Sequence, residues 1–381
     1  MRDLLQKGAN WDAIVANAER HRMSALLFEG VEAAAQDLVS PEQIQLLGAA
    51  VRLAGTKTLP LVGELLRLHQ LFETAKIPAI PYKGPVLATL AYGNFSHRDY
   101  VDLDFALPQS HIPEAARLLQ AWGYSPQFDL REAHAGERGF APGQYTFLSV
   151  KQQTLLELHT ERTLRYYPTP VDFQDLNSRL IRVEIAGQSL RTFSVEDTLV
   201  ILCVHGAKHF WECLFWILDI ARLISAREVN WTLLSEVAAR MESKRVLLLG
   251  LHLANDLFGA ALPDSALRQI RGDKQVQTLA RSGREQYAGN SGATFGVWPR
   301  AVFRLRSRDK FWSGLRHLAR LSMSPTESDR QTMRLPGVFA PLYTLLRPWR
   351  LLGEYGLGLK RRPRDLRRRE SGETAKPRNE S

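Results

Sequence analysis

The chain of 381 residues has only two cysteines, no long apolar run and no internal repeat. Cys203 and Cys213 fall ten residues apart in one predicted helix, which separates them by about 15 Å and excludes a disulfide between them. The nearest approach to a membrane span, Val246–Leu262, contains a histidine, an asparagine and an aspartate, so no integral membrane segment is expected. The first twenty residues lack the basic flank and apolar core of a secretory signal. We therefore expect a soluble, cytoplasmic protein.

Positive charge is concentrated near the end of the chain. Residues 360–369 hold seven basic residues and one aspartate, a net +6 of the formal charge of +10. Because this segment is too polar to bury a core, we predict a disordered basic tail at 360–381. Such a tail could attract an anionic membrane surface, nucleic acid or an acidic partner, and a solvated tail without a partner is an equal alternative. The remaining composition, with 45% hydrophobic and 24% charged residues, is ordinary for a globular protein.

The strongest candidate for a functional motif lies in the stretch Ile77–Leu107. It begins with a short apolar run that predicts a buried strand. The turn Lys83-Gly84-Pro85 ends this strand and begins a helix, since proline is favoured in the first helical turn. After the helix, apolar residues alternate with acidic ones. This alternation predicts a second strand with Asp102 and Asp104 on the same face.

Two carboxylates side by side on a strand repel each other unless a cation neutralises them. Mg²⁺ is the natural candidate, because proteins hold it through one or two carboxylates together with substrate phosphates. The Lys83-Gly84 turn leads into a helix N-terminus, whose free N–H groups and bare Cα let a phosphate chain come close. Lys83 and Arg98 would add positive charge for the phosphates. The alternative is an edge strand with two solvated aspartates after an ordinary strand–turn–helix unit.

This order of strand, Lys-Gly turn, helix, Arg98 and acidic strand resembles the nucleotidyltransferase superfamily that includes DNA polymerase beta. More narrowly, it is similar to the bacterial "uncharacterised nucleotidyltransferase" family, whose members carry these features at this spacing. The superfamily usually has a Gly-Ser turn, and Pro85 stands here in place of the serine, so a phosphate contact from that hydroxyl is absent. The resemblance implies an α+β fold, with a small mixed β-sheet flanked by helices and a mostly α-helical C-terminal region.

A second pair of strands, predicted at 144–150 and 154–160, places Glu157 and His159 on one face. The resemblance implies a third carboxylate on a strand next to the aspartates, where it completes the metal cage and helps to deprotonate the attacking hydroxyl. We assign this role to Glu157, and the alternative is a polar residue on a half-exposed strand. The narrower family tends to have histidine at the position of His159. A role in orienting the acceptor competes there with simple packing.

Helical patterns dominate the rest of the chain. Two separate helices are predicted at 41–53 and 59–75, and Ser194 is expected to cap a long helix that ends near His209, with the helical pattern continuing over 211–226. The predicted organisation is a helical region at 1–75, a nucleotidyltransferase core at 76–193, a helical domain at 194–359 and the basic tail at 360–381.

His205, Lys208 and His209 are spaced to share one face of the long helix. The run H-G-A-K-H-F-W followed by W-I-L-D is similar to a second motif of the family, H-x-x-K-H-x-W and W-x-x-D. Three interpretations stand: a transition-metal site on the two histidines, polar packing, and an anion site that contacts the nucleotide or the acceptor. Asp219, eight residues after Trp211, is expected to pair with one of these basic groups or to cap a neighbouring helix.

The resemblance implies a magnesium-dependent nucleotidyltransferase. An acceptor hydroxyl or phosphate would attack the α-phosphate of a nucleoside triphosphate such as ATP and release pyrophosphate, with two Mg²⁺ ions held by Asp102, Asp104 and Glu157. The acceptor would be a small molecule, a sugar or a protein. The alternative is a catalytically inactive binding protein on the same fold, which contacts a membrane or nucleic acid through its basic tail. The intact carboxylates favour the enzyme, whereas the missing serine favours the alternative.

Overall fold

The computed structural model describes residues 2–95, 97–128, 143–151, 153–160, 173–288 and 297–310. The chain divides into two compact units, residues 1–317 and 318–381, and every described residue belongs to the first. The predicted tail at 360–381 lies outside the described residues. The predicted boundaries at 75, 193 and 359 stay a prediction.

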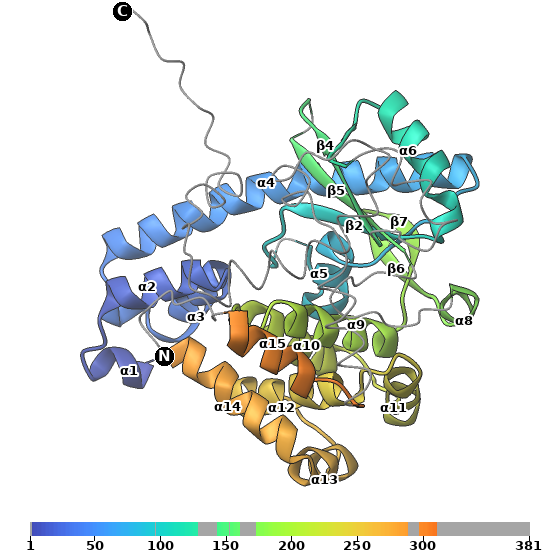
Figure 1. Cartoon of the computed structure of the whole chain (residues 1–381). Helices are drawn as coiled ribbons and strands as arrows, with labels where there is room; N and C mark the ends of the chain where they lie inside the picture. The colour runs from blue at the N-terminus through green and yellow to red at the C-terminus, as the bar shows by residue number, and fades with distance from the viewer. Residues whose placement is uncertain are drawn as a thin grey trace, which may run out of the picture. The chain divides into compact units, whose positions relative to one another are not determined.

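Four helices precede the sheet: α1 (Arg2–Gln6), α2 (Trp11–Arg20), α3 (Ser24–Ala34) and α4 (Pro41–Thr74), with the 3₁₀ turn η1 (Gln36–Leu38) before α4. Side chains define their starts. Asn10 accepts a hydrogen bond from the N–H of Ala13, and Ser40 and Gln43 form a reciprocal capping box at the start of α4. The long α4 runs beside the sheet in Figure 1.

The prediction of two helices at 41–53 and 59–75 is wrong, because α4 continues through Pro60 without a break. A proline inside a helix removes its own N–H bond and strains one turn, but it does not prevent the flanking turns from forming. In the turn before Pro60, the hydroxyls of Thr56 and Thr58 donate to the carbonyl oxygens of Leu53 and Gly55, both at 2.8 Å. Leu47, before the proline, packs in a core with α2 and α3, and Leu61 and Leu65, after it, pack in the main core.

The main sheet has five strands in the order β1-β2-β5-β4-β3. They are β1 (Ile80–Pro81), β2 (Asp102–Ala106), β3 (Ser125–Pro126), β4 (Gln144–Ser149) and β5 (Thr154–His159). β2 and β5 are parallel, and the other pairs are antiparallel. The sheet is therefore mixed, and the predicted α+β class is confirmed. The helices α5 (Gly84–Tyr92) and α6 (Ile112–Ala121), the latter after the turn η2 (Gln109–His111), connect the first three strands.

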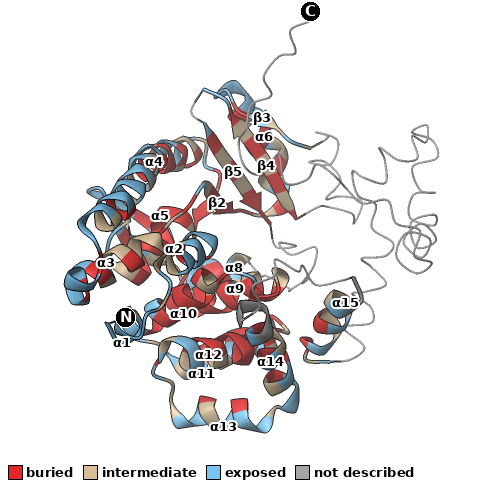
Figure 2. Cartoon of the chain, turned by 90° about the vertical axis from the view of Figure 1, so that its left-hand side faces the viewer, coloured by how far each residue is buried: buried red, intermediate tan, exposed pale blue. Residues whose placement is uncertain are grey.

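A second, two-stranded sheet and a group of helices follow. The elements are α8 (Phe173–Ser178), β6 (Ile181–Ile185), β7 (Gln188–Thr192), α9 (Val195–Lys208), α10 (Leu214–Ala226), α11 (Trp231–Arg240), α12 (Lys244–Phe258), α13 (Asp264–Gly272), α14 (Lys274–Ala288) and α15 (Val297–Arg306). The central helices α9, α10 and α12 are buried over most of their length (Figure 2). One hydrophobic core joins them to the sheet, and α5 packs against both β2 and α10.

The prediction that Cys203 and Cys213 lie in one helix is wrong, although both are free thiols as expected. α9 ends at Lys208, and Phe210 and Trp211, which follow the C-cap residue His209, have left-handed backbone angles with φ of 58°. The indole of Trp211 folds back onto Gly206, where a Cβ atom would lie 2.2 Å from the ring. This reversal separates α9 from α10, and it requires glycine at the contact.

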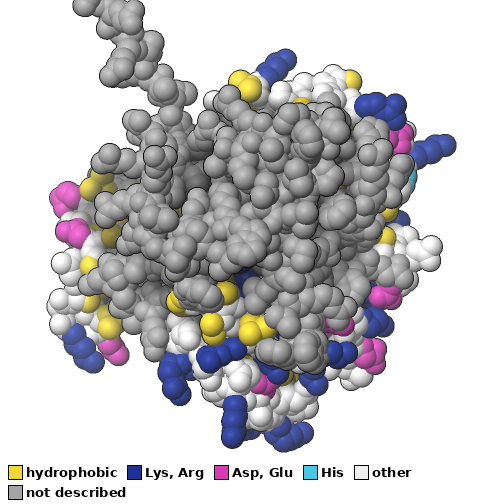
Figure 3. Space-filling model, viewed as in Figure 1, with side chains coloured by type: hydrophobic (Ala, Val, Ile, Leu, Met, Phe, Trp, Pro, Cys, Tyr) yellow, Lys and Arg dark blue, Asp and Glu magenta, His cyan; other side chains and the backbone are white. Residues whose placement is uncertain are grey.

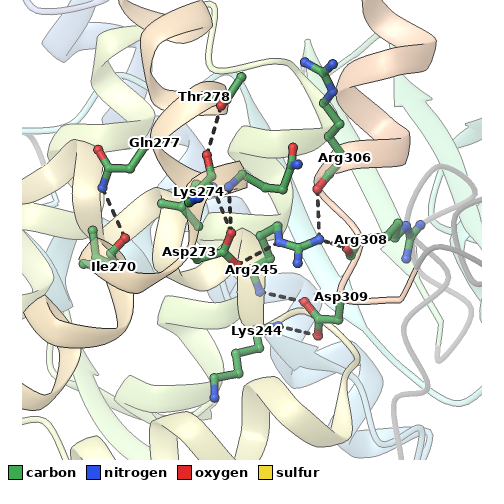
Figure 4. Close-up of polar contacts among 12 residues, drawn as sticks. Lys244, Arg245, Ile270, Asp273, Lys274, Gln277, Thr278, Arg306, Arg308 and Asp309 are labelled. Atoms are coloured by element: carbon green, nitrogen blue, oxygen red, sulfur yellow. Dashed lines mark hydrogen bonds and ion pairs between the residues drawn. The ribbon is translucent and has the colours of Figure 1, made fainter.

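The start of α12 is fixed by side chains from distant parts of the chain (Figure 4). The backbone N–H groups of Lys244 and Arg245 donate to the carboxylate of Asp309, at 2.9 and 2.7 Å. The guanidinium of Arg245 donates to Asp273 and to the carbonyl oxygens of Arg306 and Arg308. A carboxylate at a helix N-terminus satisfies its free N–H groups and complements the helix dipole, so Asp309 anchors the end of α15 to α12.

Basic side chains also lie outside the predicted tail. On the face shown in Figure 3, Lys and Arg gather at the lower margin, over α13 and α14. These helices carry the exposed residues Arg268, Arg271, Lys274, Arg281 and Arg284. Within the described ranges, no helix combines the length and the apolar character that crossing a bilayer requires.

Candidate active site

The Lys83-Gly84 turn lies directly against strand β2. Gly84 has φ +52°, and a Cβ atom there would lie 3.2 Å from the carbonyl oxygen of Asp102. Glycine is thus required for the turn to approach the strand, a reason different from the phosphate contact that the sequence suggested. Lys83, in extended conformation, places its Nζ 2.9 Å from Oδ1 of Asp104.

Strands β2 and β5 bring the predicted carboxylates together. Their register sets Asp104 opposite Glu157, and Asp102 lies two residues before Asp104 on the same face. His159 Nε2 lies 2.9 Å from Asp104 Oδ1 and 3.3 Å from Glu157 Oε2. One ligand atom each from Asp104, Glu157 and His159 falls within 4.8 Å of the other two. The structure therefore joins the acidic group predicted from the sequence and adds His159 to its centre.

Two of the three carboxylates have a compensating partner. Burial alone would raise the pKa of Asp104, but the charge of Lys83 and the hydrogen bond from His159 outweigh it and hold that pKa well below its usual range. Burial also opposes ionisation of Glu157, and the hydrogen bond and charge of His159 lower its pKa nonetheless. Asp104 and Glu157 are therefore ionised at neutral pH.

Asp102 is the carboxylate without such a partner. Within the described part of the chain, its side chain makes no hydrogen bond and no ion pair. Burial and the nearby charge of Asp104 raise the pKa of Asp102 to about 6. The charges of Lys83 and Arg98 act in the opposite direction but do not outweigh these two effects. A partly buried carboxylate that is repelled by its neighbour in this way is what a divalent cation would stabilise.

The residues fit Mg²⁺ through their carboxylates better than through the imidazole. Asp102, Asp104 and Glu157 offer the hard oxygen ligands that Mg²⁺ prefers. The Nδ1 atom of His159 is buried and has no hydrogen-bond partner. A metal-bound histidine usually donates its second N–H to an acceptor. In His159, Nε2 already contacts two carboxylates and Nδ1 has no acceptor, so the imidazole lacks the support that a metal ligand usually has.

Arg98 is committed to a buried ion pair. Its guanidinium donates to Asp219 of α10 at 2.9 to 3.2 Å, and the hydroxyl of Tyr92 donates to the same carboxylate at 2.9 Å. Asp219 thus pairs with Arg98, and the expectation that it pairs with the basic face of α9 is wrong. Arg98 still lies close enough for its charge to act on Asp102. Its predicted role in nucleotide binding stays a prediction.

The basic face of α9 lies next to the carboxylates. Lys208 Nζ lies 3.3 Å from Oε1 of Gln144, the β4 residue that pairs with His159. Burial and the charge of Lys83 lower the pKa of Lys208, while Glu157 and Asp104 act in the opposite direction. Among the described residues, the group able to hold a metal is the Asp104–Glu157–His159 group, and no third ligand joins His205 and His209.

A cavity of about 250 Å³ has Arg98 in its lining and none of the three carboxylates. It is lined by α2, α3 and α4, by residues 97–99 and by Phe215. Arg98 packs 5.2 Å from the centre of the Phe215 ring in this lining, and its charge also acts on Asp102.

Sequence reasoning missed three residues at the site. Tyr82, just before the Lys-Gly turn, packs its ring edge-on against His159 at 5.6 Å. Gln144 and Trp216 complete the surroundings of the α9 face. Tyr82 and Trp216 lie within apolar runs that indicate only core packing, and the tryptophan of the W-x-x-D motif was the one available signal for Trp216.

Comparison with known proteins gives a family and a distant structural likeness. The family model described as "Uncharacterised nucleotidyltransferase" matches residues 7–259. No curated protein matches the chain. The crystal structure of an antigenic nucleotidyltransferase-like protein from Paracoccidioides brasiliensis aligns with 16% identity and a TM-score of 0.36, over 55% of this chain and 92% of that one.

Proposed function

We propose that this chain, which belongs to the family of uncharacterised nucleotidyltransferases, transfers a nucleoside monophosphate from a nucleoside triphosphate to an acceptor hydroxyl or phosphate. The observation that carries the proposal is the register of β2 and β5. It sets Asp104 opposite Glu157 and leaves Asp102 beside them as a carboxylate whose ionisation the nearby charges of Lys83 and Arg98 do not fully offset. Asp102, Asp104 and Glu157 would hold Mg²⁺.

When bound, Mg²⁺ would neutralise the triphosphate and stabilise charge on the attacking and leaving oxygens. The chain itself supplies positioning. His159 keeps Glu157 ionised, so Glu157 can accept a hydrogen bond from the attacking hydroxyl. Lys83, fixed over the centre by Asp104 and packed on the Tyr82 ring, presents an ammonium group to the phosphates in place of the absent serine hydroxyl.

The test is transfer of label from α-³²P nucleoside triphosphates in a cell lysate with Mg²⁺, followed by separation of protein, sugar and nucleic acid. The wild-type chain should label one acceptor class. Asp104→Asn and Glu157→Gln should each lower the rate at least ~100-fold, because each removes a charge that only this group supplies. Glu184→Gln, an exposed strand glutamate of β6, is the matched control and should leave the rate unchanged.

Thermal melting separates chemistry from folding. Asp104→Asn should lower the melting temperature with Mg²⁺ absent, because it weakens the buried pairs with Lys83 and His159 more than it relieves repulsion with Asp102. Activity is therefore compared per folded chain, at a temperature at which both proteins are folded. Magnesium-dependent transfer that persists in Asp104→Asn would contradict the assignment. Tight binding of MgATP without transfer to any acceptor class would favour the inactive binding protein.

A further inference from the structure

Three flat side chains meet where α9 turns into α10. The ring centroids of His205 and His209 lie 4.8 Å apart, and the indole of Trp216 lies 5.3 Å from the first and 5.1 Å from the second. All three residues are partly exposed. We call them the ring cluster.

The ring cluster lies on the side of α9 that faces the carboxylates. Lys208, on the same face, lies within hydrogen-bonding distance of Gln144, whose strand neighbour is His159. The charges of Lys83 and Glu157 both act on His209. A substrate whose phosphates sit at Lys83 would therefore have the ring cluster beside it.

The two imidazoles are uncharged at neutral pH. Burial, reinforced by the charge of Lys83, holds the pKa of His205 well below its usual range. Burial and the charge of Lys208 lower the pKa of His209 to about 3. Neutral rings attract phosphate weakly, so the anion-site interpretation suits Lys208 and not the histidines. Neutral rings next to a phosphate site suit a flat, uncharged group, and aromatic side chains stack on bases of every kind.

We propose that the ring cluster binds the nucleobase of the nucleoside triphosphate, with Trp216 as the stacking surface and the two histidines along the base edge. This inference rests on the proposed function, since it takes the phosphates to lie at the carboxylate group. Purines offer a larger stacking surface than pyrimidines, so MgATP and MgGTP bind more tightly than MgCTP and MgUTP.

The test compares two ligands that share the phosphates and differ in the base: MgATP and magnesium tripolyphosphate, titrated by calorimetry. Trp216→Leu should raise the Kd for MgATP about 10-fold, which is within the range for loss of one stacked base. The same variant should leave the Kd for tripolyphosphate unchanged. Lys83→Met should weaken both ligands. Trp122→Leu is the matched control, because Trp122 is 45% exposed at the end of α6.

Trp216→Phe guards against misfolding, because it keeps an aromatic face and should recover most of the MgATP affinity. Equal weakening of both ligands by Trp216→Leu, or wild-type affinity for MgATP, would overturn the proposal. A wild-type chain that binds tripolyphosphate as tightly as MgATP would also overturn it and leave the triphosphate site intact. If the wild-type chain binds neither ligand, the proposed function is contradicted, and the base-binding role of the ring cluster is contradicted with it.

Discussion

Removal of the Asp219 carboxylate should destabilise the fold more than any other single charge change at the site. Asp219 is fully buried, and it accepts three contacts from the Arg98 guanidinium and one from Tyr92. In Asp219→Leu, the positive charge of Arg98 stays buried with no partner. Breaking a buried pair in this way costs about 3–5 kcal/mol of unfolding free energy.

The expected shift in melting temperature follows from the size of the unit. Unfolding entropy near the midpoint is about 2.1 cal/mol/K per residue, so a unit of about 300 residues loses about 0.6 kcal/mol of stability per degree. Asp219→Leu should therefore lower Tm by about 5–8 °C in differential scanning calorimetry. Asp37→Leu is the matched control. Asp37 pairs with Arg2 at 2.6 Å, but both side chains are about half exposed, at 60% and 47%, so its Tm should not change measurably.

The double variant Arg98→Met with Asp219→Leu separates structure from function. It removes both charges, and apolar side chains of similar size often replace a buried ion pair at little cost, so most of the lost Tm should return. The Kd for MgATP should stay at least ~10-fold above wild type if the Arg98 charge also supports the nucleotide beside Asp102. An Asp219→Leu chain that melts at the wild-type temperature would refute the reasoning.

Two further predictions address the turn and the histidines. Gly84→Ala should lower the unfolding free energy by about 1 kcal/mol and abolish most transfer activity, because the new Cβ would lie against the carbonyl oxygen of Asp102. Gly93→Ala is the matched control, since Gly93 has φ +71° and no atom within 4 Å of an added Cβ. It should show the loss of stability alone. The pKa of His209 is about 3 in the folded chain and about 6.5 in the unfolded chain. Between these values the unfolded chain binds a proton at His209 and the folded chain does not, so the unfolding free energy should fall as the pH drops from 6.5 toward 3. His209→Phe should make the decline in Tm with pH measurably shallower, and an unchanged decline would contradict a neutral His209.

Local signals in the sequence predicted local structure. Ser194 caps the helix that it was expected to cap, and the side chain of Asn10 and the left-handed Gly93 mark the start of α2 and the end of α5. Alternation of apolar and acidic residues predicted β2 with both aspartates on one face. Each of these features depends on residues within one turn or one strand, so periodicity and capping rules suffice.

Other features depend on contacts between distant residues. The reversal after Lys208 is fixed by Trp211 folding onto Gly206, and neither residue signals a break by its type alone. Arg98 and Asp219 are 121 residues apart, and no spacing rule connects them. The resemblance indicated that Glu157 lies on a neighbouring strand, but only the parallel register of β2 and β5 sets it opposite Asp104.

The three carboxylates differ in what a cation would change for each. Asp104 already has Lys83 and His159 on one oxygen, and Glu157 shares His159, so both are ionised without a metal. Asp102 makes no ion pair with either group, and its raised pKa reflects burial and the charge of Asp104, which the more distant charges of Lys83 and Arg98 do not offset. A bound divalent cation would therefore stabilise the ionised form of Asp102 more than that of the other two carboxylates, because its attraction would offset the repulsion from Asp104. Since β2 holds Asp102 two residues from Asp104, the same strand supplies both the unsatisfied ligand and the compensated one.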